Sequence, residues 1–503
     1  MVRKLGLCAC LLLVGTLVVD GQTRDQNWDK CKADDPDTSI AGCTALIQSG
    51  QESTTDLASA YFDRGIAYRQ KKQSDLAMQD LNAALKLKPD FAGALNTRGN
   101  VYSDQGQYDQ AIADYNDALR FDSNYALAYY NRGNAWGSKK EWDKAIADYD
   151  VYVQKAPTDA DGFNNRGHAY MAKGEYDRSL EDYQEALRLN PNHALAIYNT
   201  GVAQSDKKNY SQAVIEFNRY IELKPEDPDG YESRGNAYRH QGQYDQAIGE
   251  YNSALQKKAD YSLAYYYLGL VHARQGLYEP AVTDETKYIE LEPKDPDGFT
   301  MRGLAYYQLG NYTQAIEDYD KAKELKPNQA NTFFDIGCAH LLAGQNAEAV
   351  ADFELAIGVD PSTSSAVYSA LWLRVAKARL HQDATEEMKD VAQKANLSKW
   401  PGAVLKLYLG QGTSDEAMVA SADPDPQTQQ GQICEANFYA GEDSLLRHDR
   451  AAALLRLKSA RDNCPKSYYE YAAALVELKR ATAPARAATP TKATARPAKP
   501  AAN

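Results

Sequence analysis

The residue types that perform most enzymatic chemistry are present in this chain, but they lack catalytic spacing. Its seven histidines are scattered, and no group of them has the spacing of metal ligands. The sequence contains neither a phosphate-binding glycine loop nor a nucleophile elbow. These observations predict a protein that is not an enzyme and that uses no metal and no cofactor.

The carboxylates recur at a fixed interval, which indicates an architectural role. Nine consecutive units each carry an acid at the same position: Asp80, Asp114, Asp148, Asp182, Glu216, Glu250, Asp284, Asp318 and Asp352. Six of these units carry an arginine at a constant distance before the acid: Arg64, Arg98, Arg132, Arg166, Arg234 and Arg302. We predict a repeated structural ion pair between two helices of a unit. His272 and His340 occupy a slot held elsewhere by tyrosines such as Tyr68, so they are interpreted as core substitutes.

The elements that position these residues are marked by a glycine that recurs from Gly65 to Gly337 with a period of about 34 residues. Twelve residues after each glycine comes alanine or serine, and four residues further on comes a large, mostly aromatic side chain. Small residues let two helices approach closely, and the aromatic ring fills the space beside them. Glycines such as Gly106 and prolines such as Pro89 then end the helices. The pattern predicts an all-α chain of antiparallel helical hairpins.

This spacing of small, aromatic and proline residues resembles the tetratricopeptide-repeat (TPR) family over nine units, residues 58–363. The resemblance implies a right-handed superhelical solenoid in which the first helix of each hairpin lines a concave groove. It also implies a protein or peptide partner, because such grooves typically bind peptides or partner proteins.

Helix geometry places a set of amides and rings on the groove side of the first helices. These residues are Asn100, Asn131, Asn134, Asn165, Asn199 and Asn236, interleaved with Tyr130, Tyr198, Tyr266 and Phe334. Carboxamides donate to and accept from an extended peptide backbone, and aromatic faces hold side chains. We predict that these residues bind the partner. The alternative is that the asparagines are common family residues and that the rings pack against adjacent units.

A second period, twice as long as the first and here called the double period, is superimposed on it. Tyr152, Tyr220 and Tyr288 stand where the other units carry alanine, and each is followed by an Asp-Gly pair. Large and small residues are therefore expected to alternate along the array. Glu285 breaks the pattern, because it occupies the aromatic position of the seventh unit. Burying a carboxylate costs free energy. Glu285 is therefore expected either to form a hydrogen bond with a nearby group or to mark a less stable point in the solenoid.

Four cysteines lie where hairpin geometry brings chain segments together. Extending the repeat backwards places Cys31 at the glycine position and Cys43 at the small-residue position of a degenerate opening hairpin, residues 22–57. Cys434 and Cys464 stand at the two ends of a final TPR-like unit within a helical region, residues 364–480. We predict two disulfides, Cys31–Cys43 and Cys434–Cys464, with free structural cysteines as the alternative. The second would lock a closing cap that ends with a helix from Tyr468 to Lys479.

The two ends of the chain differ in composition from the repeats. Residues 1–21 combine Arg3 and Lys4 with an apolar stretch too short for a membrane span, which predicts a cleavable signal peptide and an exported protein, periplasmic or secreted. Cys8 and Cys10 raise the alternative of a lipid anchor. Residues 481–503 are rich in alanine, proline and lysine without an acid, which predicts a disordered tail. Its basic residues either remain solvated or touch anionic envelope components.

The net charge of the chain and the sequence of its terminal region narrow the range of functions that it can have. Fifty-six lysines and arginines against 69 acids give a net charge of −13, which disfavours nucleic acid as a partner. The Trp400-Pro401 and Cys434-Glu435-Ala436 sequences of the terminal region resemble the ends of NlpI-type periplasmic TPR adaptors. We predict a scaffold or adaptor of the cell envelope that binds a peptide or partner protein in its groove. The alternative is a structural spacer or self-associating solenoid without a specific peptide ligand.

Overall fold

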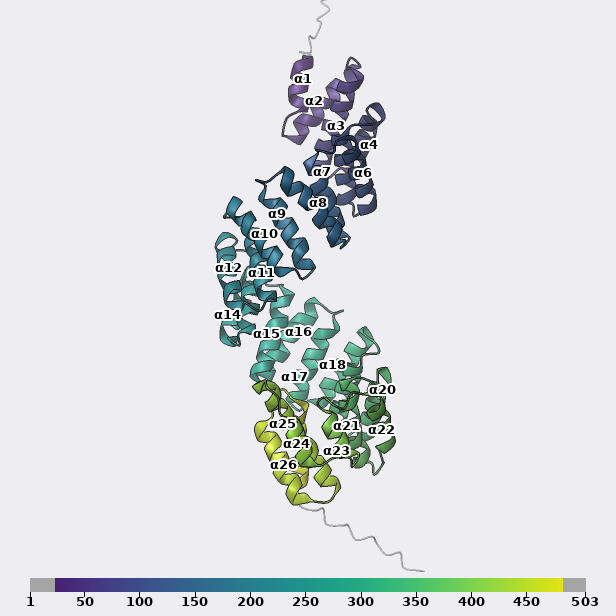
Figure 1. The fold of residues 1–503 in the computed structure, drawn as a ribbon, viewed down its shortest axis with the longest axis vertical. Helices are drawn as coiled ribbons and strands as arrows, with labels where there is room; N and C mark the ends of the chain where they lie inside the picture. The colour runs from purple at the N-terminus through teal and green to yellow at the C-terminus, as the bar shows by residue number, and fades with distance from the viewer. Residues whose placement is uncertain (1–22, 483–503) are drawn as a thin grey trace, which may run out of the picture. The chain divides into compact units, whose positions relative to one another are not determined.

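The computed structural model describes residues 23–482, which form 27 α-helices and no strand (Figure 1). The predicted signal peptide, Cys8, Cys10 and residues 483–503 of the predicted tail lie outside these described residues. The described part divides after Pro225 into two compact bodies, here called unit 1 and unit 2. None of its helices is both long enough and apolar enough to cross a membrane. The predicted all-α fold of helical hairpins is confirmed.

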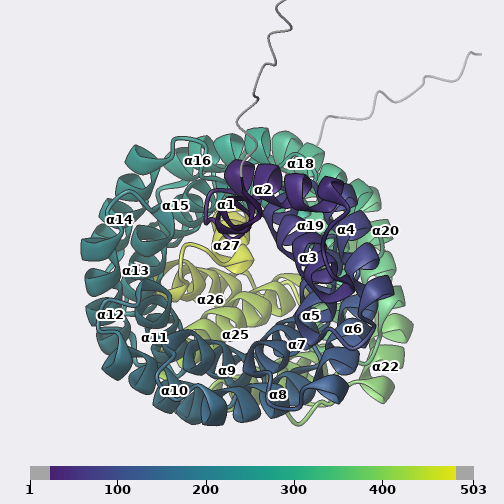
Figure 2. The same cartoon turned by 90° about the horizontal axis from the view of Figure 1, so that it is seen from above.

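Unit 1 consists of six hairpins that follow one another along the chain. Their helices are α1 (Arg24–Cys31), α2 (Pro36–Ser49), α3 (Thr54–Gln70), α4 (Ser74–Leu87), α5 (Ala92–Asp104), α6 (Tyr108–Phe121), α7 (Ala126–Ser138), α8 (Trp142–Lys155), α9 (Ala160–Ala172), α10 (Tyr176–Leu189), α11 (Ala194–Asp206) and α12 (Tyr210–Leu223). In Figure 2 the first helices, from α3 to α11, lie on the inner side of the curve of this unit, and the second helices lie on its outer side.

Unit 2 continues the repeat with four hairpins and then adds seven further helices. The hairpins are α13 (Pro228–His240), α14 (Tyr244–Lys257), α15 (Ser262–Gln275), α16 (Tyr278–Leu291), α17 (Pro296–Gln308), α18 (Tyr312–Leu325), α19 (Ala330–Ala343) and α20 (Asn346–Val359). The additional helices are α21 (Ser364–Arg379), α22 (Thr385–Lys394), α23 (Gly402–Tyr408), α24 (Ser414–Ala420), α25 (Pro426–Leu446), α26 (Arg450–Asn463) and α27 (Tyr469–Thr482). Within this unit, α25–α27 lie on the inner side of the hairpins (Figure 2).

The repeated glycine marks the point where the two helices of a hairpin are closest. A Cβ atom added to Gly99 would lie 2.6 Å from the Tyr115 ring, so no larger residue fits beside this tyrosine. Tyr115 is 1% exposed. The same contact recurs between Gly201 and Phe217 at 2.6 Å. Glycine is thus required by the aromatic side chain that fills the hairpin, as the spacing predicted.

Two of the repeat helices in unit 2 begin at Asp-Pro pairs. The Asp227 side chain accepts the backbone N–H of Asp229 at the start of α13, and Pro228 occupies the first turn. Asp295 does the same for Asp297 at the start of α17, beside Pro296. A carboxylate accepting a free N–H and a proline with no N–H to satisfy both stabilise these first turns.

The predicted arginine–acid pairs are confirmed in all six hairpins that carry the arginine. Arg132 donates from Nε and Nη2 to both oxygens of Asp148, at 2.8 and 2.5 Å. The Asp148 side chain is only 7% exposed. The equivalent ion pairs are Arg64–Asp80, Arg98–Asp114, Arg166–Asp182, Arg234–Glu250 and Arg302–Asp318. Each pair joins the first helix of a hairpin to the second.

Two histidines replace the arginine as partner of the acid. His272 Nδ1 lies 2.7 Å from Asp284 Oδ2, and His340 Nδ1 lies 2.6 Å from Asp352 Oδ2. The arginine position of these two hairpins holds an apolar residue, Leu268 or Ile336. The interpretation of the histidines as core substitutes therefore missed their pairing with the repeated acid.

Side-chain packing explains the double period. A Cβ atom on Gly162 would lie 2.7 Å from the Tyr152 ring, and one on Gly298 would lie 2.7 Å from the Tyr288 ring. The Tyr288 hydroxyl also donates to Asp295, at 2.5 Å. The extra tyrosine of every second hairpin thus occupies the space left by the glycine of the following Asp-Gly pair.

The sulfur atoms of both predicted cysteine pairs lie at bonding distance. Cys31 Sγ and Cys43 Sγ are 1.99 Å apart within the α1–α2 hairpin. Cys434 Sγ and Cys464 Sγ are 1.92 Å apart and join α25 to the segment after α26. Cys338 is the one free cysteine of the described residues, and it is buried in α19.

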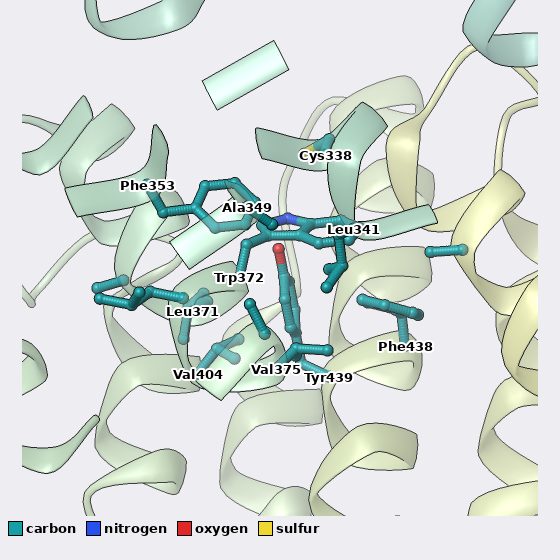
Figure 3. Close-up of a cluster of buried hydrophobic side chains, with 14 of the residues drawn as sticks. Cys338, Leu341, Ala349, Phe353, Leu371, Trp372, Val375, Val404, Phe438 and Tyr439 are labelled. Carbon is teal, nitrogen blue, oxygen red and sulfur yellow. The ribbon is translucent and has the colours of Figure 1, made fainter. Parts of the chain in front are cut away.

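The helices after the repeats share a core with the last hairpins. Trp372 of α21 is fully buried and stacks on Phe438 of α25, with ring centroids 5.3 Å apart (Figure 3). Phe353 of α20 and Tyr439 of α25 pack around the same indole. This core joins the irregular C-terminal helices to the end of the repeat array.

Glu285 is buried in the α15–α16 hairpin without a partner. It is 1% exposed, and neither of its carboxylate oxygens has a hydrogen-bond partner. It takes the place of the aromatic ring against Gly269, where an added Cβ atom would lie 2.3 Å from its Oε1. Burial, reinforced by the charge of Asp284, raises the pKa of Glu285 to about 9. Of the two expectations, that of a nearby bond is therefore wrong.

Candidate functional site

The predicted asparagine ladder is present in unit 1, and two of its amides donate to asparagines of a neighbouring first helix. Asn131 of α7 donates to Asn96 of α5 at 3.0 Å. Asn199 of α11 donates to Asn164 of α9 at 3.1 Å. Since these partners lie on neighbouring hairpins, the amides tie the first helices of the array together.

A second group of predicted asparagines accepts the hydroxyls of the buried tyrosines. Asn100 accepts from Tyr115 at 2.8 Å, and Asn134 accepts from Tyr149 at 2.6 Å. Asn236 of unit 2 accepts from Tyr251 at 2.9 Å. These amides therefore anchor the aromatic side chains that fill the hairpins.

The predicted tyrosines pack on the extra tyrosines of the double period. Ring centroids are 4.8 Å apart for Tyr130 and Tyr152, and 5.0 Å apart for Tyr198 and Tyr220. In unit 2 Tyr266 packs on Tyr288 at 5.3 Å. All ten predicted groove residues are half-buried. Each of these three ring pairs lies within a single hairpin, so they do not show the packing against adjacent units that was named as the alternative.

Two of the predicted asparagines line one cavity of unit 1, which is formed by α7, α8 and α9. Asn134 of α7 and Asn165 of α9 contact each other, since Asn165 Nδ2 donates to Asn134 Oδ1 at 3.0 Å. With Trp142, Tyr149 and His168 they line a cavity of about 340 Å³. The rings of Trp142 and His168 meet edge to face, 6.0 Å between centroids. Desolvation by its neighbours lowers the pKa of His168, which favours the neutral imidazole.

This cavity offers both kinds of contact that an extended chain requires. The amides can exchange hydrogen bonds with a peptide backbone, and the indole presents an apolar face to a side chain. A volume of this size accommodates one large side chain or a short backbone segment. Trp142 and His168 were missed in the sequence because they differ from the residues at the same positions in other hairpins.

In unit 2 the chain itself covers part of the predicted groove. Phe334 of α19 packs against Tyr469 of α27, with ring centroids 5.6 Å apart. The Tyr469 hydroxyl donates to Asp335 at 2.8 Å, and its ring meets that of Tyr307 at 4.7 Å. α27 thus packs on the first-helix side of the array. The last helix therefore covers part of the surface on which Phe334 was predicted to bind a partner.

A cavity of about 620 Å³ remains beside this contact. It is lined by residues of α19, α21, α25 and α27, including Phe334, Asp335, Tyr368, Glu435 and Glu470. Burial raises the pKa of Asp335 to about 7. Burial also raises the pKa of Glu435, and the charge of Glu470 adds to this effect. These acids lie far apart in the sequence, so no spacing revealed that they meet.

The described residues contain no metal-binding arrangement. Among residues 23–482 no three His, Cys, Asp or Glu side chains are placed to hold an ion. The Glu435 carboxylate instead accepts from the Tyr368 hydroxyl at 2.7 Å and from the Trp400 indole at 2.6 Å.

Comparisons with known proteins agree with the hairpin architecture. A family model described as TPR repeat matches residues 65–106, 99–137 and 235–276. Models described as tetratricopeptide repeat match residues 160–193, 216–249, 296–329 and 330–363. No curated protein sequence matches the chain significantly.

Solved structures similar to the chain include tetratricopeptide-repeat proteins. A tetratricopeptide repeat protein from Parabacteroides merdae is 21% identical, covers 46% of this chain and 93% of its own, and has a TM-score of 0.40. YrrB, described as a TPR protein with an unusual peptide-binding site, is 22% identical over 37% of this chain and 96% of its own, with a TM-score of 0.33. PilF of Pseudomonas aeruginosa is 18% identical over 43% of this chain and 98% of its own, with a TM-score of 0.39.

Proposed function

This chain is a tetratricopeptide-repeat protein, and from that premise we propose that it is a non-enzymatic adaptor that binds an extended peptide segment on the inner side of unit 1. The observation that carries the proposal is the cavity lined by α7, α8 and α9, where Asn134, Asn165, Trp142 and His168 meet. Amide groups and an accessible indole lie together there. That combination recognises a peptide backbone and one of its side chains at the same time.

The adaptor is proposed to act outside the cytoplasm. The composition of residues 1–21 supports export, and the pairing of Cys31 with Cys43 and of Cys434 with Cys464 supports an oxidising compartment such as a periplasm. The basic residues of the tail support a contact with anionic envelope components.

The proposal is tested with a displayed random-peptide library selected against the full chain. The affinity of an enriched peptide is then measured for Trp142→Ala, for His168→Ala and for the control Gln110→Ala, which alters an exposed residue of α6. We expect Trp142→Ala to weaken binding about tenfold or more, because an aromatic anchor contributes at least ~1.4 kcal/mol. The control is expected to bind like the wild type.

The alternative of a spacer or self-associating solenoid predicts a different outcome. No peptide would then be enriched, or enriched peptides would bind all variants equally. Sedimentation velocity at rising concentration would in that case show association of the chain with itself. Circular dichroism of each variant verifies that its helices are intact.

A further inference from the structure

The α11–α12 hairpin lacks the arginine that other hairpins place between their helices. Thr200 stands at that position, and its hydroxyl is bonded to the backbone carbonyl of Ala196 at 2.7 Å. The acid of the hairpin, Glu216, is present and only 8% exposed. A cavity of about 470 Å³ lies beside it, lined by Leu180, Gln184, Leu187, Arg188, Thr200, Gln204, Glu216 and Arg219.

The neighbouring hairpins show which group such a position holds. In the preceding hairpin Arg166 donates from Nε and Nη2 to Asp182, which follows it in the chain, at 2.9 and 2.6 Å. Its Nη1 donates to Asp150, which precedes it by the same sequence distance, at 2.8 Å. Arg132 divides its donors in the same way, with Asn116 as the earlier acceptor at 2.6 Å. A guanidinium thus bridges two acceptors, one on the second helix of its own hairpin and one on the second helix of the preceding hairpin.

Both acceptors are retained around Thr200. Gln184 of α10 stands at the earlier acceptor position, one repeat after Asp150, and Glu216 of α12 stands at the later one, one repeat after Asp182. Both line the cavity. The other two regular hairpins without the arginine differ, since an apolar residue occupies its position and a histidine bonds the acid. Among the nine regular hairpins of the described chain, α11–α12 combines a small residue at this position with a cavity.

An incoming group can replace the present hydrogen-bond partners of Glu216. Arg219 Nη1 donates to it at 2.7 Å, and Gln212 Nε2 donates to it at 3.2 Å. The Arg219 side chain is 43% exposed and lies one helical turn along the same helix, so this ion pair is weak and Arg219 can turn to solvent. Arg188 does not add a free charge, because two of its nitrogens bond both oxygens of Glu185.

We propose that this cavity receives the arginine side chain of a partner protein or peptide. The incoming guanidinium donates two hydrogen bonds to Glu216 and one to Gln184, as the chain's own arginines do in the preceding hairpins. Leu180 and Leu187 contact its methylene groups. A lysine ammonium cannot form the same planar pair of bonds, so the site discriminates between the two cations.

The test compares N-acetyl-arginine amide with N-acetyl-lysine amide as ligands of the full chain, by chemical-shift titration. We expect the arginine amide to bind at least fivefold more tightly than the lysine amide. Glu216→Gln should weaken its binding at least tenfold, and Thr200→Arg should do the same by filling the cavity with an internal guanidinium. Arg219→Ala should strengthen binding severalfold, because it removes the competing donor.

Thermal unfolding separates these effects from misfolding. Thr200→Arg should raise the midpoint by restoring the regular ion pair, although it blocks the ligand. Gln110→Ala, at an exposed position of α6, should leave the affinity for the arginine amide unchanged. The arginine cavity shares no lining residue with the cavity of Trp142, so failure of the proposed peptide site does not affect this result. Absent binding, equal affinity for the two amides, or unchanged binding by Thr200→Arg would each overturn the proposal.

Discussion

Glu285→Gln tests the energetic cost of the carboxylate that replaces an aromatic ring in the α15–α16 hairpin. The wild-type side chain is 1% exposed, and both its oxygens lack a partner. Glutamine has nearly the same shape but does not ionise. The substitution therefore removes the titration while leaving the packing against Gly269 nearly unchanged.

The raised pKa of Glu285 sets the size of the expected change in the free energy of unfolding. Burial raises the pKa of Glu285 from 4.5 to about 9, so the folded protein holds the proton more tightly than the unfolded chain. This contribution to stability is complete below pH 4.5 and is lost as the pH rises towards 9. Each pH unit within that window costs about 1.4 kcal/mol. At pH 7 we expect wild-type unit 2 to have lost about 3 kcal/mol relative to acid pH.

The assay is urea unfolding of the wild type and Glu285→Gln between pH 5 and pH 8, followed by circular dichroism. The difference between the two proteins should grow by about 1.4 kcal/mol per pH unit in favour of the variant, because other titrating groups cancel. Hydrogen exchange should assign the change to α15 and α16. Glu279→Gln, at an exposed position of α16, is the control and should show no such slope. A difference between wild type and Glu285→Gln that stays constant with pH would refute the reasoning.

Three further predictions concern the remaining architecture. Asp148→Asn should lower the free energy of unfolding by about 3 kcal/mol in urea titrations, because it leaves the Arg132 guanidinium half-buried without its carboxylate; a loss below ~0.5 kcal/mol would contradict this role. Replacing Cys31 and Cys43 by serine should destabilise the opening hairpin by about 3 kcal/mol and expose it to proteolysis, whereas equal protease resistance would show that the pair contributes little. Tyr469→Ala should cost about 3 kcal/mol and speed hydrogen exchange in α27, and unchanged exchange there would mean that this ring does not hold the helix.

Much of the hairpin architecture was predictable because each contact within a repeat spans a short, constant distance in sequence. Gly99 precedes Tyr115 by the same distance as Arg132 precedes Asp148. A contact that recurs in every repeat reveals itself through residue types alone. Trp142 and His168 recur nowhere, so their shared cavity was not predictable in this way.

The ten predicted groove residues illustrate the same limit. Their placement on the first helices followed from helix periodicity, whereas the hydrogen bond between Asn131 and Asn96 depends on how neighbouring hairpins stack. The packing of Phe334 against Tyr469 joins residues that lie far apart in the sequence, and no repeat relates them. Such pairings arise only when the last helix folds back over the array.

By itself the sequence determined the hairpins, their closest contacts and the six arginine–acid pairs. Local interactions within a single repeat decide each of these features. The tertiary structure alone decided which amides bond to each other, where cavities remain and which part of the inner face α27 covers. It also showed that Thr200 leaves a space at a position that other arginines fill, because a cavity depends on all the side chains around it.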